Sequence, residues 1–185
     1  SDESIAAPAK FVITGPPGAN STIRAGEDFS FKIQAQNSAG ALTPNFDKTA
    51  LSGKLSAVET ALEPCTVPGL NKGNLGATTT SEFLKGEAGV TLSWSEVGKM
   101  GLKAKLTDFL GSGLAVEGGT ACDAIGNFIP HHFHVALADP AAKFYYSSQP
   151  FGVVVTARNK GKGATTNYNK ATGLSQAGTL SAWKE

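Results

Sequence analysis

The sequence predicts an all-β protein with a sandwich architecture. Apolar and polar residues alternate with a period of two along much of the chain, and Gly-rich breaks separate the alternating stretches. Long runs of Glu, Lys, Leu and Ala at helical spacing are missing. One stretch also recurs later without a gap, which indicates a structural repeat. Together these observations predict an immunoglobulin-like antiparallel β-sandwich followed by a partial second immunoglobulin-like repeat.

The strands are predicted where the alternation is regular. Between residues 27 and 37 every second residue from Phe29 to Ala35 is apolar, which is the pattern of a strand with one face on a core. The same pattern puts Trp94 on the apolar side of its strand, and Phe133 and Val135 are expected to hold the buried face of theirs. The seven predicted strands of the first unit are residues 11–14, 27–37, 43–46, 51–58, 88–95, 102–108 and 125–135.

The repeat joins residues 29–46 to residues 151–168. Each residue of the second stretch lies 122 positions after its counterpart. Shorter echoes link residues 9–11 to 142–144 and residues 55–58 to 180–183. Because Asn, Gly, Thr and an aromatic residue recur at the end of both stretches, we interpret that segment as a structural turn rather than a binding loop. The identical pairs are Phe29/Phe151, Ala35/Ala157, Asn37/Asn159, Thr43/Thr165 and Asn45/Asn167.

The repeat divides the chain into a sandwich at residues 1–137 and an incomplete second unit at residues 138–185. The second unit has no counterpart of residues 83–135, so it is expected to expose an apolar sheet face and open strand edges. We expect this segment to pack against the first unit or to pair with another chain, which makes self-association through residues 138–185 a prediction. The short connection between the units favours a fixed, end-to-end arrangement.

Charge and composition exclude some classes of partner. Sixteen basic residues are scattered among fifteen acidic ones, and the net charge is +1, which argues against nucleic-acid binding. No apolar run approaches the roughly 20 residues that span a bilayer, so direct membrane insertion is not expected. The chain begins with a polar segment and no Met, as is expected of a mature or excised fragment whose signal peptide, if any, has been removed.

The two cysteines, Cys65 and Cys122, predict a disulfide formed in an oxidising compartment. They lie too far apart to resemble the close pairs of zinc sites. Two buried free thiols are the alternative.

Catalytic and metal-binding signals are few. The chain has no nucleophile elbow, and Asp108 and Asp123 are isolated carboxylates. On a strand His132 and His134 would share a face, but a metal needs a further ligand, and we expect both imidazoles to face solvent. We therefore predict no enzymatic activity, no cofactor and no metal. Tyr145 and Tyr146 are adjacent, and one of them would be displayed on a strand. The candidate ligand-contact residues are Tyr145, Tyr146, His132 and His134.

Part of the chain resembles the MshQ-like proteins. Residues 125–133 (IGNFIPHHF) are similar to the Ile-Gly-Arg-Phe-x-Pro-Asp-His-Phe signature of that family, with Asn127 and His131 in place of its Arg and Asp. Residues 108–112 and 144–168 resemble the stretches on either side. The resemblance covers about residues 80–185. It implies a Gram-negative cell-surface protein associated with biogenesis of the mannose-sensitive haemagglutinin pilus, which is type IV-like, and with no known catalytic activity.

The function predicted from these observations is a non-catalytic structural or interaction module of such a pilus-associated protein, exported through the periplasm. Its partners would be other domains of the same protein or pilus components. The alternative is an adhesin domain that binds a glycan or a host surface directly. Exposed aromatic side chains beside polar loops would favour the adhesin.

Overall fold

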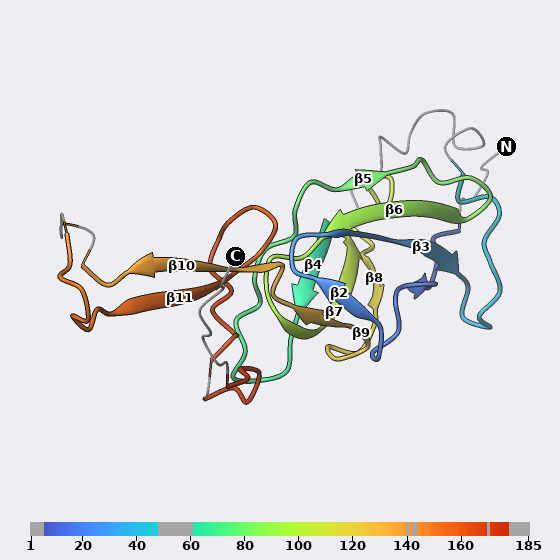
Figure 1. The fold of residues 1–185 in the computed structure, drawn as a ribbon. Coiled ribbons are helices and arrows are strands. Elements are labelled where there is room, and N and C mark those ends of the chain that lie inside the picture. The colour runs from blue at the N-terminus through green and yellow to red at the C-terminus, as the bar shows by residue number, and fades with distance from the viewer. Residues whose placement is uncertain (1–5, 48–60, 140, 142–143, 170, 178–185) are drawn as a thin grey trace, which may run out of the picture.

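The computed structural model describes residues 6–47, 61–139, 141, 144–169 and 171–177, and these residues form strands and turns without a helix. A nine-stranded sheet folds over into a sandwich, and a two-stranded ladder projects from one end of it (Figure 1). The predicted all-β fold is confirmed. Since the described part of the chain contains no helix, it offers none that is long and apolar enough to cross a membrane.

Two layers make up the sandwich. One layer has the order β1-β3-β6-β5, and the other contains β2, β9, β7 and β4, with β8 linking β7 to β1. These are the two strand sets of an immunoglobulin-like sandwich. The strands are β1 (Lys10–Thr14), β2 (Thr22–Arg24), β3 (Asp28–Gln36), β4 (Ala61–Cys65), β5 (Thr79–Thr80), β6 (Glu87–Ser93), β7 (Gly98–Leu106), β8 (Val116–Gly119) and β9 (Ile125–Ile129).

Most neighbouring strands are antiparallel, as predicted, and two pairs are parallel. β1 runs parallel to β8, and β2 runs parallel to β9. The first segment of the unit consists of β1 and β2 and changes layer between them, at the Gly-Pro-Pro-Gly break of residues 15–18. The last segment consists of β8 and β9 and runs in the same direction. β1 therefore lies parallel to β8 in one place, and β2 lies parallel to β9 in another. The alternation of apolar residues carries no information about strand direction.

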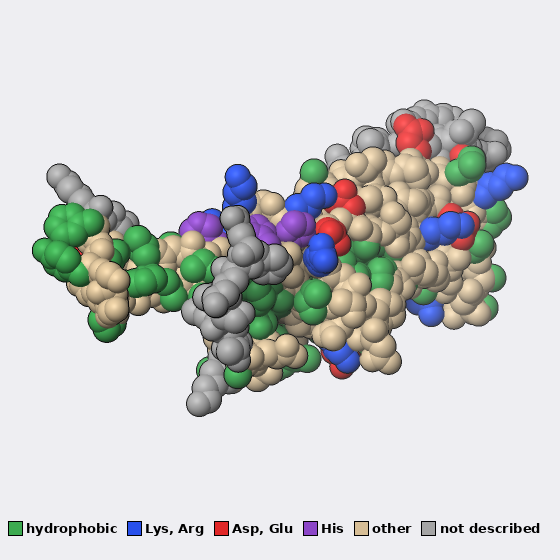
Figure 2. Space-filling model, in the orientation of Figure 1, with side chains coloured by type: hydrophobic (Ala, Val, Ile, Leu, Met, Phe, Trp, Pro, Cys, Tyr) green, Lys and Arg blue, Asp and Glu red, His purple; other side chains and the backbone are tan. Residues whose placement is uncertain are grey.

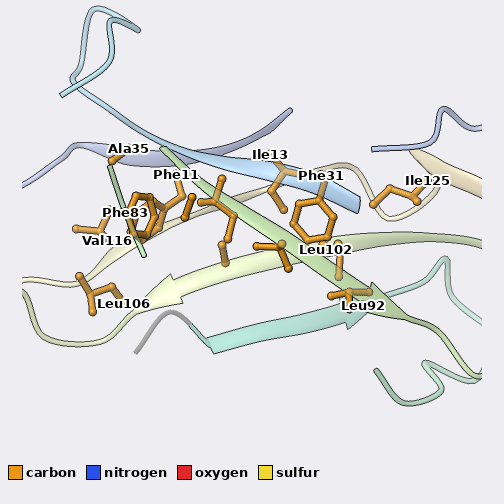
Figure 3. Packing of buried hydrophobic residues seen from close by; sticks show 14 of the residues in the cluster. Phe11, Ile13, Phe31, Ala35, Phe83, Leu92, Leu102, Leu106, Val116 and Ile125 are labelled. Atoms are coloured by element: carbon orange, nitrogen blue, oxygen red, sulfur yellow. The ribbon is translucent and has the colours of Figure 1, made fainter. Parts of the chain in front are cut away.

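The core lies between the two layers. In Figure 3 Phe11, Ile13 and Phe31 point from β1 and β3 toward the layer that contains Leu102 of β7. Trp94 is fully buried, as predicted. Its ring packs edge-on against Phe128 at 5.0 Å between centroids, and its indole N–H donates to the Lys72 carbonyl at 2.7 Å. Burial of each such large side chain is worth about 1.5–3 kcal/mol.

Four predicted strands are confirmed, at β1, β3, β6 and β7. Residues 43–46 form a turn instead, closed by a hydrogen bond from the Phe46 amide to the Thr43 carbonyl, although Phe46 is buried. The strand predicted at residues 51–58 lies outside the described residues. The one predicted at residues 125–135 is wrong, since the chain breaks around Pro130 into β9 and β10, which belong to different sheets. Proline has no N–H to continue a ladder.

The projecting ladder is a structural copy of β1 and β3. It consists of β10 (His132–Leu137) and β11 (Val153–Arg158), and it pairs Phe133 with Ala157. In the first unit Phe11 pairs with Ala35, which is the same register 122 positions earlier. β10 is therefore the counterpart of β1, in place of the predicted residues 142–144, of which 142 and 143 lie outside the described residues. The echo at residues 180–183 lies outside them too.

The turn after each copied strand repeats bond by bond. The Thr43 hydroxyl donates to the Ala35 carbonyl, and the Thr165 hydroxyl donates to the Ala157 carbonyl. The side-chain oxygen of Asn37 accepts the Ala41 amide at 3.0 Å, and the side-chain oxygen of Asn159 accepts the Gly163 amide at 3.0 Å. These bonds confirm the repeat and support its interpretation as a structural turn.

The two copies differ in burial. Phe133 and Val135 are more than half exposed, so the expectation that they hold a buried face is wrong. The alternation is present, but β10 leaves the sandwich and no described layer covers it (Figure 1). The boundary between residues 137 and 138 remains a prediction, and the pairing of β10 with β11 favours a division before β10.

Candidate functional site

The disulfide anchors the segment that reaches the second copy. Cys65 ends β4, and its bond to Cys122 in the turn between β8 and β9 confirms the predicted pair. Beyond Cys65 the chain makes an excursion, residues 66–78, along the side of the sandwich. The bridge therefore fixes the start of this excursion to the layer that contains β7.

The excursion holds the second copy through Asn71, whose side-chain nitrogen donates to the Thr166 hydroxyl at 3.0 Å and whose backbone pairs with Asn167. Asn167 is buried, and its side-chain oxygen accepts the Asn71 amide N–H at 2.8 Å. Its side-chain nitrogen donates to the Asn71 carbonyl at 2.9 Å. This two-way pairing satisfies backbone groups of the excursion with a residue about a hundred positions later.

Glu96 is the centre of the contact. Its side chain is buried in the connection between β6 and β7, at the end of the sandwich from which the ladder projects. One carboxylate oxygen accepts the Thr166 amide at 3.0 Å and the Thr166 hydroxyl at 2.8 Å, and the other accepts the Asn167 amide at 3.0 Å. Hydrogen bonds to an ionised acceptor are about twice as strong as neutral ones.

A second contact lies beside the first. The Asn159 side-chain amide donates to the Ser95 carbonyl at 3.1 Å, and the Lys160 amide donates to the Ala25 carbonyl at 2.9 Å. Gly26 has a φ of +85°, and a Cβ there would lie 2.9 Å from the backbone nitrogen of Lys160. Only glycine fits both the conformation and the close approach. We call the contacts of residues 159–167 with residues 25–26, 71 and 95–97 the junction.

The side chains with shifted pKa values, Glu87, Lys105 and Glu117, lie on the outer faces of the sandwich, away from the junction. A hydrogen bond from Gln34, and then the charge of Lys32, lowers the pKa of Glu87 below its usual value. The contact between Lys105 and Glu117, at 2.7 Å, raises the pKa of the lysine and lowers the pKa of the glutamate. Solvent-exposed pairs of this kind contribute little to stability.

The four predicted ligand-contact residues do not form one site. Tyr145 is half-buried against Phe151, and Tyr146 is exposed with its ring 5.6 Å from that of Phe144. Both tyrosines lie in the loop between β10 and β11, where Figure 2 shows apolar side chains gathered at the far end of the ladder. His132 and His134 lie on β10 itself, nearer the sandwich.

The side chains of His131 and His132 contact each other, and His131 also lies near Glu27. His134 is exposed as expected, whereas His132 is half-buried, with its Nδ1 3.1 Å from Nδ1 of His131. His131 lies 3.9 Å from Glu27. Among the residues that the structure describes, no group of three His, Cys, Asp or Glu side chains is placed to hold a metal.

Replacing His132 and His134 together with Ala is expected to leave the metal content unchanged. The free energy of unfolding should change by about 1 kcal/mol or less, because His134 is exposed and His132 is half-buried with a single side-chain contact to His131. Elemental analysis of the purified protein and thermal melting check these two outcomes. Stoichiometric metal that disappears in the variant would contradict the prediction.

The second half of the chain is similar to a known domain family. Residues 96–185 match the family model described as DUF6701, third domain. No curated protein matches the chain. The matched segment starts at Glu96 and contains β7 to β11 together with the turn that Glu96 holds. Residues 96–185 thus resemble an uncharacterised domain family, and the junction lies largely within the resemblance.

Proposed function

We propose that the chain is a non-catalytic structural and interaction module of a Gram-negative cell-surface protein, of the MshQ-like, pilus-associated kind. The module holds one β-sandwich unit and the start of the next at a fixed angle. The observation that carries this proposal is the buried Glu96 carboxylate, which accepts three hydrogen bonds from the second copy. The disulfide suits export to an oxidising compartment.

The junction resists bending because it closes a second connection between the units. The covalent connection runs from β9 through Pro130 into β10. The Glu96 contacts lie on the turn that follows β11, so both strands of the ladder are attached at their ends near the sandwich (Figure 1). Bending would break the three hydrogen bonds that Glu96 accepts, and hydrogen bonds to a charged group contribute about 1.5–3 kcal/mol each.

A glycan-binding adhesin is the second candidate. Phe144 and Tyr146 are strongly exposed in the loop at the far end of the ladder. In the repeat, however, residues 144–146 stand 122 positions after β2, which pairs with β9 in the first unit. Their exposure therefore has a structural explanation, and the module remains the leading proposal. Loss of glycan binding in a Tyr146→Ala variant would favour the adhesin.

The rigidity of the junction is testable with residual dipolar couplings of backbone amides. In the wild-type protein we expect one alignment tensor to fit both β3 and β11. Glu96→Ala should weaken docking by about 3 kcal/mol, because it removes charge-assisted hydrogen bonds and leaves their donors unpaired. Couplings from β11 should then shrink and require a second tensor.

Glu117→Ala is the matched control, because it removes an equally charged side chain from an exposed ion pair that joins β8 to Lys105 of β7. It should keep a single tensor, with a stability change below about 1 kcal/mol. Two unrelated tensors in the wild-type protein would overturn the proposed rigid module.

A further inference from the structure

The ladder carries half of a hydrophobic core, and the first unit shows what covers such a half. Phe11 and Phe29 are 2% and 6% exposed, whereas their counterparts Phe133 and Phe151 are 53% and 57% exposed. Val155 is 46% exposed, and its counterpart Ile33 is fully buried. Since sequence pattern, register and turn are all repeated, the copies differ in neighbours and not in local structure.

One of the missing neighbours is an edge strand. In the first unit β3 lies between β1 and β6, and Phe29, Phe31 and Ile33 pair with Leu92, Val90 and Ala88. In the described part of the chain β11 pairs only with β10. The edge of β11 that corresponds to the β6 side therefore presents backbone groups for an antiparallel strand.

The other missing neighbour is a facing layer. After β6 the chain crosses to the second layer and returns as β7, whose Met100, Leu102 and Ala104 are buried in the same core. A segment that consists of an edge strand followed by such a crossing strand would both extend the ladder and cover its apolar face.

We propose that β11 accepts a strand of this kind from a partner polypeptide. The partner segment runs antiparallel to β11 and places apolar residues opposite Phe151, Val153 and Val155, as Leu92, Val90 and Ala88 are placed opposite β3. It then crosses over the face formed by Phe133 and Val135. This interaction goes beyond the proposed structural role, and it depends on the ladder rather than on the junction.

The test uses a probe from the chain itself, a synthetic peptide of residues 87–106, which contains β6 and β7. Added to the intact wild-type protein, the peptide should shift the amide resonances of β11 and leave those of β3 in place. A peptide with Val90→Thr and Leu92→Thr should bind at least about 100-fold more weakly, because it no longer buries two apolar side chains on binding.

Two variants of the protein test whether the peptide binds to the apolar face of β11 or to its opposite face. Val154 and Val155 are neighbours on β11, about equally exposed, and point to opposite faces. Val154 corresponds to Lys32, which shows that a charge is tolerated on its face. Val155→Asp should reduce peptide affinity at least about tenfold, and Val154→Asp should leave it unchanged.

Three results would overturn the proposal. In the first the peptide produces no shifts at all, and in the second it shifts β3 by displacing the resident β6. The third is a protein that is already dimeric by sedimentation and becomes monomeric on Val155→Asp, which would make a second copy of the chain the occupant. Each of these leaves the dipolar-coupling test of the junction unaffected, so the two proposals fail separately.

Discussion

Replacing Cys65 and Cys122 together with Ala is expected to lower the free energy of unfolding by about 4 kcal/mol. The bridge joins residues 57 positions apart, and a cross-link over such a loop removes about this much conformational freedom from the unfolded chain in the chain-entropy model. Chemical denaturation of the variant and of the wild-type protein measures the difference. Alkylation of the wild-type protein with and without reductant, followed by mass measurement, should show two labels only after reduction.

Reduced wild-type protein is the control for this prediction. It should lose as much stability as the double variant, because both lack the cross-link while only the variant has altered side chains. A double variant as stable as the oxidised protein would show that the bridge contributes nothing. The bridge also fixes the excursion that presents Asn71 to Asn167, so amide exchange at Asn71 should accelerate in the variant.

The sequence predicted the features that depend on local pattern. Alternation located β3, β6 and β7, because a strand with one face on a core must alternate. The repeat was visible because two copies of a turn need the same Asn and Thr for the same hydrogen bonds. The short strands β2 and β5 escaped prediction, since two or three residues carry no measurable period.

The features that depend on the rest of the molecule could not be predicted. Phe133 and Val135 have a buried-strand pattern, and their exposure results from the absence of a facing layer in the described chain. Nothing in the local sequence distinguishes Glu96 from other acidic residues, because its donors lie some seventy positions later. The repeat did not mark Asn167 either, since Asn45 is the same residue at the same position of the turn and is exposed, whereas Asn167 is buried.

Phe29→Ala and Phe151→Ala are expected to have very different effects, although they change the same residue type at the same position of the repeat. Phe29 is buried and packs against Phe31 and Phe128, so its truncation should cost about 3–5 kcal/mol. Phe151 is exposed and has a ring contact with Tyr145, whose loss should cost about 1 kcal/mol. Chemical denaturation at low protein concentration measures both values.

The pair also shows whether the apolar face is free in solution. If Phe151→Ala destabilises the protein as much as Phe29→Ala, something already covers Phe151, and the loss should grow with protein concentration where the cover is a second molecule. If the ladder is free, the cost of Phe151→Ala stays small until the 87–106 peptide is added. It should then rise toward that of Phe29→Ala, because the bound strands give Phe151 the neighbours that Phe29 already has.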